Sequence, residues 1–178
     1  MKGMKKILFA LCASLSLISC AKNESQKGEI KLENKTSVQA TDINGYAKKS
    51  MFAVGKPNEA FSKYFSGDSY LEVLNNSSAF VANVTFEPGC RNNWHIHHAA
   101  SGGGQLLICT AGEGWYQEEG QPAVSLQPGT VITIPANVKH WHGAKRDSWF
   151  SHIAVEVPGT ECKNEWCEPV SDEAYAKL

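Results

Sequence analysis

Histidine spacing is the feature of this sequence with the clearest chemical meaning. His95 and His97 are separated by one residue, and His140 follows after a Pro-Gly turn, an apolar run and a second proline. Side chains alternate faces along a strand, so the imidazoles of His95 and His97 point the same way. His98 then points the opposite way and is not expected to be a ligand. The spacing predicts that three histidines from two strands bind one metal ion inside a small β-barrel.

Three further titratable residues are candidates for chemistry beside this metal. His142 shares a face with His140 if the strand is regular, so its imidazole lies near the metal without being an obvious ligand. Such a group suits a general base with a pKa near neutrality, and a packing role is the alternative. His152 and Glu156 share one face of a later strand. A buried carboxylate there needs a partner, for which the metal, His142 and His152 are candidates, unless its role is structural.

Short β-like segments, each followed by turn residues, must position these groups. An early strand is expected near Phe52 and Val54, and a brief helix is expected to begin at Asn58. The main segments are residues 69–74, 80–86, 105–111, 115–117, 124–126, 131–134 and 149–157. Their spacing predicts an all-β sandwich or barrel, and no helical period is long enough for a βαβ unit.

The N-terminal region indicates export. Three lysines precede an apolar run over residues 7–18, which is too short to span a bilayer and fits a secretory signal. The run ends in Leu-Ile-Ser-Cys, which resembles a bacterial lipobox, where cleavage precedes Cys20 and lipid is attached to its thiol. An ordinary signal peptide or a membrane anchor is the alternative. We therefore expect a signal peptide over 1–19, a flexible lipid-anchored tether over 20–45 and a folded domain over 46–178, in a bacterial cell envelope.

Composition limits the possible partners. The chain has 178 residues, enough for one domain with a real core, and is 42% hydrophobic and 20% charged. Removal of residues 1–19 takes three lysines away from 17 basic residues, against 18 acidic ones. A mildly acidic chain without a basic cluster is a poor candidate for nucleic-acid binding. Cys162 and Cys167 are close enough in sequence to form a disulfide, whereas the absence of a CxxC spacing disfavours a thiolate metal site.

Two motifs in this chain resemble those of cupins. The string Gly89-x5-His95-x-His97, followed by Gln105 and Gly112, is similar to the first cupin motif. The string Gly129-x5-Pro135-x-Asn137-x2-His140 is similar to the second. The resemblance implies an all-β cupin jelly-roll barrel with short helical decorations at both ends of the domain. It is strongest to small single-domain cupins, which include manganese-dependent hydroxynitrile lyases and cupins associated with carboxymuconolactone decarboxylases.

The resemblance also implies a ligand set. His95, His97 and His140 would supply imidazoles and Gln105 an amide oxygen to one divalent metal. The resemblance favours manganese, and iron, nickel, cobalt or zinc would also suit these donors. Seven residues separate His97 from Gln105, more than the family usually has, so the loop must return the strand to register. Asn137 replaces a usual glycine, which asparagine tolerates because it adopts left-handed backbone conformations.

Three functions are compatible with these residues. The first is a metal-dependent lyase, similar to the hydroxynitrile lyases, that acts on a small hydroxylated molecule with His142 as base. In those lyases the position of Glu156 carries glutamine and lines the pocket, as do small residues at the positions of Ala82 and Val84. The alternatives are a cupin dioxygenase and a non-catalytic lipoprotein that binds a sugar or another small molecule. A homodimer formed through a sheet edge near residues 50–56 is also possible by analogy.

Overall fold

The computed structural model describes residues 42–178. The expected signal peptide, Cys20 and most of the expected tether lie outside the described residues. Within residues 42–178, no helix has the length and apolar character needed to cross a bilayer. The first helix, α1, begins at Ile43, where the Asp42 side chain accepts a hydrogen bond from the backbone of Gly45. Helix α1 thus includes residues 43–45, just before the expected start of the folded domain at residue 46.

Strands dominate the described residues, as the turn spacing predicts. In chain order the elements are α1 (Ile43–Ala47), β1 (Lys56–Pro57), the 3-10 helix η1 (Glu59–Tyr64), β2 (Phe65–Ser66), β3 (Ser69–Asn76), β4 (Phe80–Phe86), β5 (Arg91–Asn92), β6 (His95–His98), β7 (Ser101–Gly102), β8 (Gln105–Gly112), β9 (Gly114–Glu118), β10 (Val124–Leu126), β11 (Val131–Ile134), β12 (Lys139–Ala144), β13 (Phe150–Glu156), β14 (Gly159–Thr160), β15 (Lys163–Trp166) and α2 (Asp172–Tyr175).

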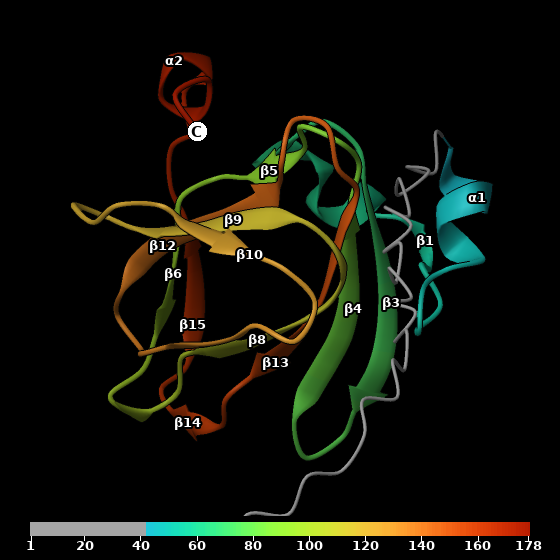
Figure 1. Ribbon diagram of the computed structural model, residues 1–178. Helices are drawn as coiled ribbons and strands as arrows, with labels where there is room; N and C mark the ends of the chain where they lie inside the picture. Colours follow the sequence, from blue (N-terminus) through green and yellow to red (C-terminus); the bar gives the residue numbers. More distant parts are fainter. Residues whose placement is uncertain (1–41) are drawn as a thin grey trace, which may run out of the picture. The chain divides into compact units, whose positions relative to one another are not determined.

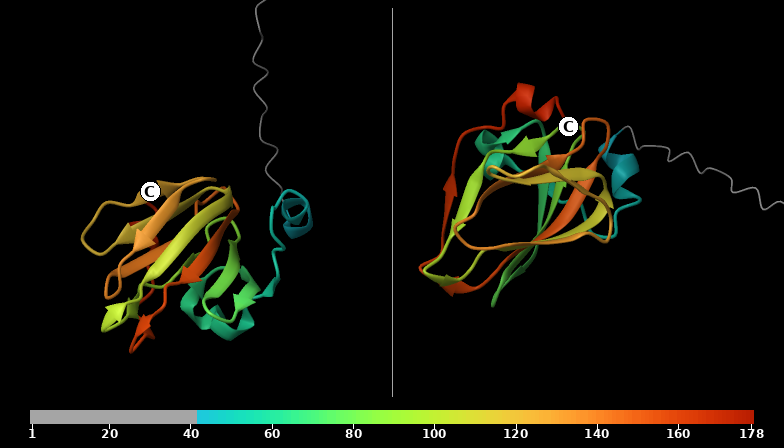
Figure 2. Two further views of the ribbon diagram at one scale, coloured as in Figure 1. Left: turned by 90° about the horizontal axis from the view of Figure 1, so that it is seen from below. Right: turned by 60° about the vertical axis from the view of Figure 1, so that its left-hand side comes forward.

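The strands form two large antiparallel sheets that face each other, a jelly-roll barrel (Figures 1 and 2). The first sheet has the order β1-β3-β4-β13-β8-β11. The second has the order β10-β9-β12-β5-β2, and β6 joins it by pairing with both β12 and β15. A small third sheet pairs β14 with β7. The expected all-β cupin architecture is confirmed.

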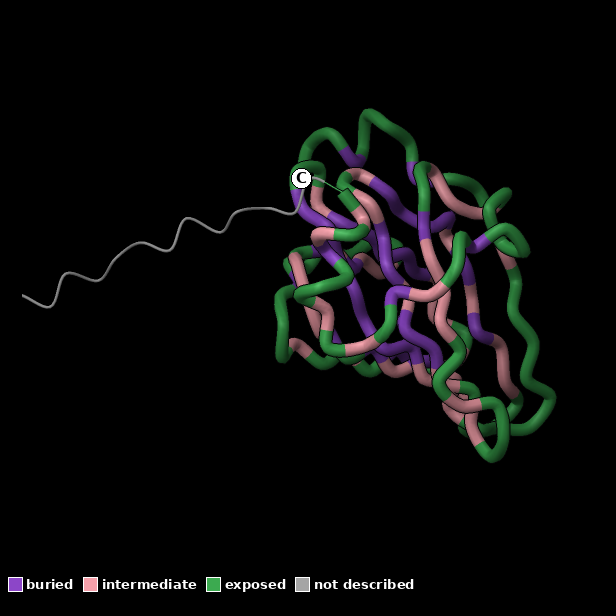
Figure 3. The backbone as a smooth tube through the Cα atoms, turned by 90° about the vertical axis from the view of Figure 1, so that its right-hand side faces the viewer, coloured by how far each residue is buried: buried purple, intermediate pink, exposed green. Residues whose placement is uncertain are grey.

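The core lies between the two sheets, where buried strand segments face one another (Figure 3). One part of this interior is apolar and includes Phe86, Leu107, Leu126 and Phe150, all fully buried. Burial of a side chain of this size contributes about 1.5–3 kcal/mol, so this cluster stabilises the barrel. The rest of the interior is different, because it contains buried histidines instead of hydrocarbon.

The short helices pack outside the barrel. Tyr46 of α1 stacks on Trp149 with ring centroids 5.0 Å apart, and its hydroxyl donates to Ser151 of β13. At the other end of the domain, α2 begins with the Ser171 side chain accepting from the backbone N–H of Ala174, as its sequence predicts. The Tyr46 contacts attach one end of the described chain to the sheets, and the Tyr175 hydroxyl of α2 attaches the other end by donating to the backbone oxygen of Ala144 in β12.

Two local expectations are wrong. Phe52 and Val54 are not in a strand, because Val54 is buried against α1 instead, and β1 begins at Lys56. Asn58 does precede a helical segment, but its side chain makes no cap bond and donates to Ser69. That segment is a 3-10 helix, and Phe65, expected on its face, already belongs to β2.

Candidate metal centre and substrate pocket

Two paired strands bring the three predicted histidines together. His95 and His97 are both buried on one face of β6, while Ile96 and His98 between and after them are only partly buried. His140 of β12 lies directly opposite His95 in the strand register. One ring nitrogen from each of the three histidines lies within 4.8 Å of the others. The group could therefore hold one metal ion.

Hydrogen bonds fix the tautomers of two of these rings. His95 Nδ1 lies 2.9 Å from the backbone oxygen of Asn93, and His140 Nδ1 lies 3.0 Å from that of Val138. A carbonyl oxygen only accepts hydrogen bonds, so in both rings Nδ1 carries the proton and Nε2 keeps its lone pair. Ligand histidines in metalloproteins typically donate their second N–H in this way.

The third ring is oriented by a carboxylate. His97 Nδ1 lies 2.9 Å from Glu156 Oε2, a close polar contact in which a proton on Nδ1 faces the carboxylate favourably and leaves Nε2 bare. The other oxygen, Glu156 Oε1, accepts a hydrogen bond of 3.1 Å from the Gln105 amide nitrogen. We expected a partner for Glu156 among the metal, His142 and His152. In the structure its partners are His97 and Gln105.

Unpartnered polar atoms test whether these residues fit a metal. Among residues 42–178, the buried atoms without a hydrogen-bond partner include His97 Nε2, His140 Nε2 and Gln105 Oε1. A buried polar atom without a partner costs about 1–3 kcal/mol, and each of these three atoms carries a lone pair that a metal ion could accept. Imidazole nitrogens with one neutral oxygen suit divalent transition metals. The residues fit such an ion, and their assignment as its ligands stays a prediction.

Glycines explain how the long loop still positions Gln105. Gly102, Gly103 and Gly104 have φ angles of 60°, 73° and 87°, a left-handed conformation that other residues avoid. At Gly104 a Cβ atom would lie 2.3 Å from the backbone oxygen of Ile134, so only glycine fits beside β11. The loop thus turns tightly and starts β8 at Gln105 with its side chain buried. Asn137 in the second motif also has a positive φ, 67°, as expected.

A polar cluster surrounds His142. The ring of His142 is buried, and its centroid lies 6.0 Å from that of His140. Its backbone N–H donates to Asn92 Oδ1 at 2.9 Å, which turns the Asn92 amide nitrogen toward the ring, 3.1 Å from His142 Nε2. The same amide nitrogen lies 3.3 Å from His142 Nδ1, and that Nδ1 lies 3.1 Å from His152 Nε2, so one imidazole nitrogen of this pair donates to the other.

Burial keeps these histidines neutral. Burial lowers the pKa of His142 well below 6.5, and the charges of neighbouring histidines, His152 first, lower it further. Burial likewise lowers the pKa of His140 and of His152 to about 4, and holds that of His95 well below 6.5. The expectation of a His142 pKa near neutrality is therefore wrong, because removing an imidazolium from water disfavours the charged form.

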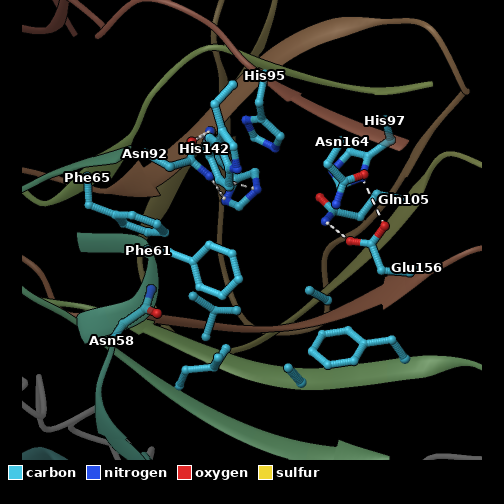
Figure 4. Close-up of a pocket in the computed structure, with 16 residues that line it drawn as sticks. Asn58, Phe61, Phe65, Asn92, His95, His97, Gln105, His142, Glu156 and Asn164 are labelled. Carbon is cyan, nitrogen blue, oxygen red and sulfur yellow. Dashed lines mark hydrogen bonds and ion pairs between the residues drawn. The ribbon is translucent and has the colours of Figure 1, made fainter. Parts of the chain in front are cut away.

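The histidines open into a pocket between the sheets (Figure 4). Its volume is about 310 Å³, and His95, His97, Gln105, His142 and Glu156 line one side of it. Apolar side chains cover the opposite side: Phe61, Phe65, Leu71, Ala82, Val84 and Ala154. This arrangement can bind a small molecule with a polar group toward the histidines and a hydrocarbon part away from them.

Several pocket residues escaped the sequence analysis. Asn92 lies in a polar run just before the HxH pair, and only its position on the short strand β5 reveals that it faces His142. Trp166 is brought in by β15, which pairs with β6. Its ring centroid lies 4.9 Å from that of His95, and the ring stacks on Tyr64 at 4.6 Å. The sequence signal for this contact was a single tryptophan at the end of the otherwise polar segment 163–166.

Other predicted residues lie where expected, or contribute nothing to the pocket. His98 points away from the cluster and contacts Glu165 through Nε2 at 2.7 Å. Cys109 is buried in the apolar core. Cys162 and Cys167 are free thiols, so the possible disulfide between them is absent from the described residues.

Comparisons with known proteins agree with this geometry. Residues 82–154 match the family model described as a cupin domain. Over 96 residues, 54% of this chain and 70% of the relative, the chain is 42% identical to a protein named (R)-mandelonitrile lyase from Granulicella tundricola. A cupin-like protein from Thermotoga maritima superposes with a TM-score of 0.63 at 38% identity, over 71% of this chain and 95% of that one. A cupin 2 conserved barrel domain protein from Rhodopseudomonas palustris superposes with a TM-score of 0.52 at 15% identity, over 69% and 81% of the two chains, and shows likeness of fold alone.

Proposed function

The chain belongs to the cupin family, and on that basis we propose that it is a metal-dependent lyase that cleaves a small hydroxylated molecule, with a hydroxynitrile as the first candidate substrate. One observation supports this most strongly: the ring nitrogens of His95, His97 and His140 converge within 4.8 Å, and a fourth, neutral histidine, His142, lines the same pocket as His95 and His97. Similarity to a protein named (R)-mandelonitrile lyase is consistent with it.

The proposed ligands are His95, His97, His140 and Gln105, with manganese as the metal. When bound there, a divalent cation supplies a Lewis acid that favours the negatively charged form of a substrate oxygen. All four ligands are neutral, so they leave the charge of the ion uncompensated. The buried histidines are neutral near pH 7, so protons compete little with a metal for His95 and His140.

His142 is the proposed base. It is neutral, it lines the pocket, and its Nε2 atom lies 3.1 Å from the amide nitrogen of Asn92, another pocket residue. In a hydroxynitrile, the hydroxyl proton would pass to His142 as the carbon–oxygen double bond forms. The bond to the nitrile carbon would break, and its electron pair would leave with cyanide. The buried imidazolium is unfavourable, so it returns the proton to cyanide, which leaves as hydrogen cyanide with the aldehyde.

The apolar wall would hold the rest of the substrate. Phe61 and Phe65 face the pocket from the segment before β3, and small side chains at Ala82, Val84 and Ala154 leave room between the sheets. A ring the size of phenyl fits a space of about 310 Å³, and its burial against these side chains favours binding. An aromatic hydroxynitrile such as (R)-mandelonitrile suits the pocket in both shape and polarity.

Release of cyanide from (R)-mandelonitrile by the manganese-loaded protein tests this function. We expect turnover by the wild type and a loss of about 10²–10⁴-fold in kcat for His142→Ala. His98→Ala is the matched control, because it removes a histidine from the outward face of the adjacent strand β6, and it should keep the wild-type rate. Equal rates for His142→Ala and wild type would contradict the assignment of the base.

Two other outcomes would replace the lyase proposal. Oxygen uptake on phenols without cyanide release would indicate the dioxygenase. Metal-dependent binding of sugars or small acids without any turnover would indicate a binding protein. The lipid anchor remains part of the proposal on sequence grounds alone: incorporation of labelled palmitate into the wild type but not into Cys20→Ala would support a location in the cell envelope.

A further inference from the structure

Glu156 occupies an unusual place beside the candidate metal centre. It ends β13 and is the direct strand partner of Gln105, the first residue of β8. Its two oxygens contact two different predicted ligands: Oε2 lies 2.9 Å from His97 Nδ1, and Oε1 accepts from Gln105 Nε2 at 3.1 Å (Figure 4). Within residues 42–178, the group of residues whose ligand atoms converge comprises only histidines, so Glu156 stands outside it.

Each of these two ligands can present the wrong atom to a metal. A neutral imidazole has one protonated and one bare nitrogen, and the proton can occupy either. A glutamine side chain has one acceptor end and one donor end, which exchange by rotation. His97 binds a metal through Nε2 only if Nδ1 carries the proton, and Gln105 binds through Oε1 only if Nε2 points away.

The carboxylate of Glu156 selects the productive state of both. Both of its oxygens are acceptors, so both neighbours must turn a donor toward it. His97 then keeps Nε2 bare, and Gln105 keeps Oε1 turned away from β13. His97 Nε2 and Gln105 Oε1 are both among the buried atoms without a hydrogen-bond partner, as is His97 Nδ1, which has the 2.9 Å contact with Glu156 instead. Because β8 and β13 are paired with Gln105 opposite Glu156, the strand register holds the Glu156 carboxylate next to the Gln105 side chain.

From this geometry we propose that Glu156 is a positioning residue of the metal centre, which presents His97 and Gln105 to the ion and takes no part in proton transfer. The inference rests on the metal centre proposed above. It revises the expectation that Glu156 is catalytic. It also explains why a carboxylate stands in a pocket whose other lining residues carry apolar, amide, imidazole or indole side chains.

Replacement by glutamine separates positioning from simple packing. Glu156→Gln keeps the size of the side chain but offers one acceptor and one donor. If its oxygen accepts from His97, its amide nitrogen faces the nitrogen of Gln105, which must then rotate and lose Oε1 as a ligand. If its oxygen accepts from Gln105, its amide faces His97 Nδ1 and drives the proton to Nε2. Either arrangement loses one ligand.

The experiment measures metal binding without any substrate. Cobalt(II) and manganese(II) are titrated into the metal-free full chain, and affinity is followed by calorimetry and by the visible absorption of the cobalt form. We expect Glu156→Gln and Glu156→Ala to weaken metal binding by about 10–100-fold, the usual effect of removing a residue that orients a ligand. Loss of one ligand should also change the cobalt spectrum of Glu156→Gln.

Two controls make the result specific. Glu165→Gln removes one negative charge from a strand next to the site, where Glu165 contacts only the outward-facing His98, and it should bind metal like the wild type. In a double-mutant cycle, Gln105→Ala should cost less affinity in the Glu156→Gln background than in the wild type if Gln105 has already rotated. Circular dichroism of each metal-free variant confirms that it is folded.

Several results would overturn the proposal. Wild-type affinity and an unchanged cobalt spectrum in Glu156→Gln would show that the carboxylate orients neither ligand. Equal weakening by Glu165→Gln would show that only net charge matters. A wild-type protein that binds neither metal would overturn this inference together with the proposed function, whereas metal binding without cyanide release would contradict the lyase alone.

Discussion

Acid should destabilise the metal-free protein, because its interior histidines resist protonation. Burial lowers the pKa of His152 from 6.5 to about 4. Between these two values the unfolded chain binds a proton that the folded chain does not, so the stabilising contribution is complete above about pH 6.5 and is lost as the pH falls toward about 4. For one such group, the free energy of unfolding falls by about 2 kcal/mol from pH 7.5 to 5, and by about 3 kcal/mol by pH 4. His140, with the same pKa, adds a similar loss.

Urea unfolding of the metal-free protein at several pH values measures this effect. His152→Gln keeps a polar side chain opposite His142 but cannot take up a proton. Between pH 7.5 and pH 5, the free energy of unfolding of this variant should therefore fall by about 2 kcal/mol less than that of the wild type. His98→Gln controls for the replacement of a histidine that points away from the barrel interior. Parallel slopes for His152→Gln and the wild type would refute the claim that a buried neutral histidine causes the loss.

Three other substitutions test the packing around the site. Gly112→Ala would place a methyl carbon 1.7 Å from a backbone oxygen at a φ of 69°, so urea unfolding should show a loss of at least about 2 kcal/mol. Tyr175→Phe removes the 2.8 Å hydrogen bond from helix α2 to the Ala144 carbonyl, and the same assay should show a loss of about 1 kcal/mol. Trp166→Ala uncovers His95, so a chelator should remove cobalt from the variant faster than from the wild type; an unchanged rate would show that the ring does not shield the metal.

The strands and the convergence of the histidines could be predicted because both follow from short-range rules. Alternation along a strand is enough to place His95 and His97 on one face, and turn residues limit each strand to within a residue or two. The second motif then supplies His140 from the neighbouring strand. The pairing of His140 opposite His95 follows from the cupin fold, and the spacing of the two motifs indicates that fold.

The remaining features depend on contacts between distant segments. Strand β15 has no alternating apolar pattern, and it pairs with the edge of β6. The contact between Trp166 and His95 therefore could not be predicted from local sequence. The partners of Glu156 depend on the register between β8 and β13, which the unusual glycine loop sets. The low pKa of His142 depends on complete burial among other histidines, a property of the assembled barrel.

Metal stoichiometry is the most direct test of whether three imidazoles from two strands share one ion. Metal-free protein is dialysed against manganese(II) or cobalt(II), and bound metal is determined by elemental analysis for the wild type and for His95→Ala, His97→Ala and His140→Ala. We predict one ion per chain in the wild type and its loss in every single variant, with His98→Ala unaffected. Full occupancy and an unchanged cobalt spectrum in His140→Ala would contradict the proposed centre.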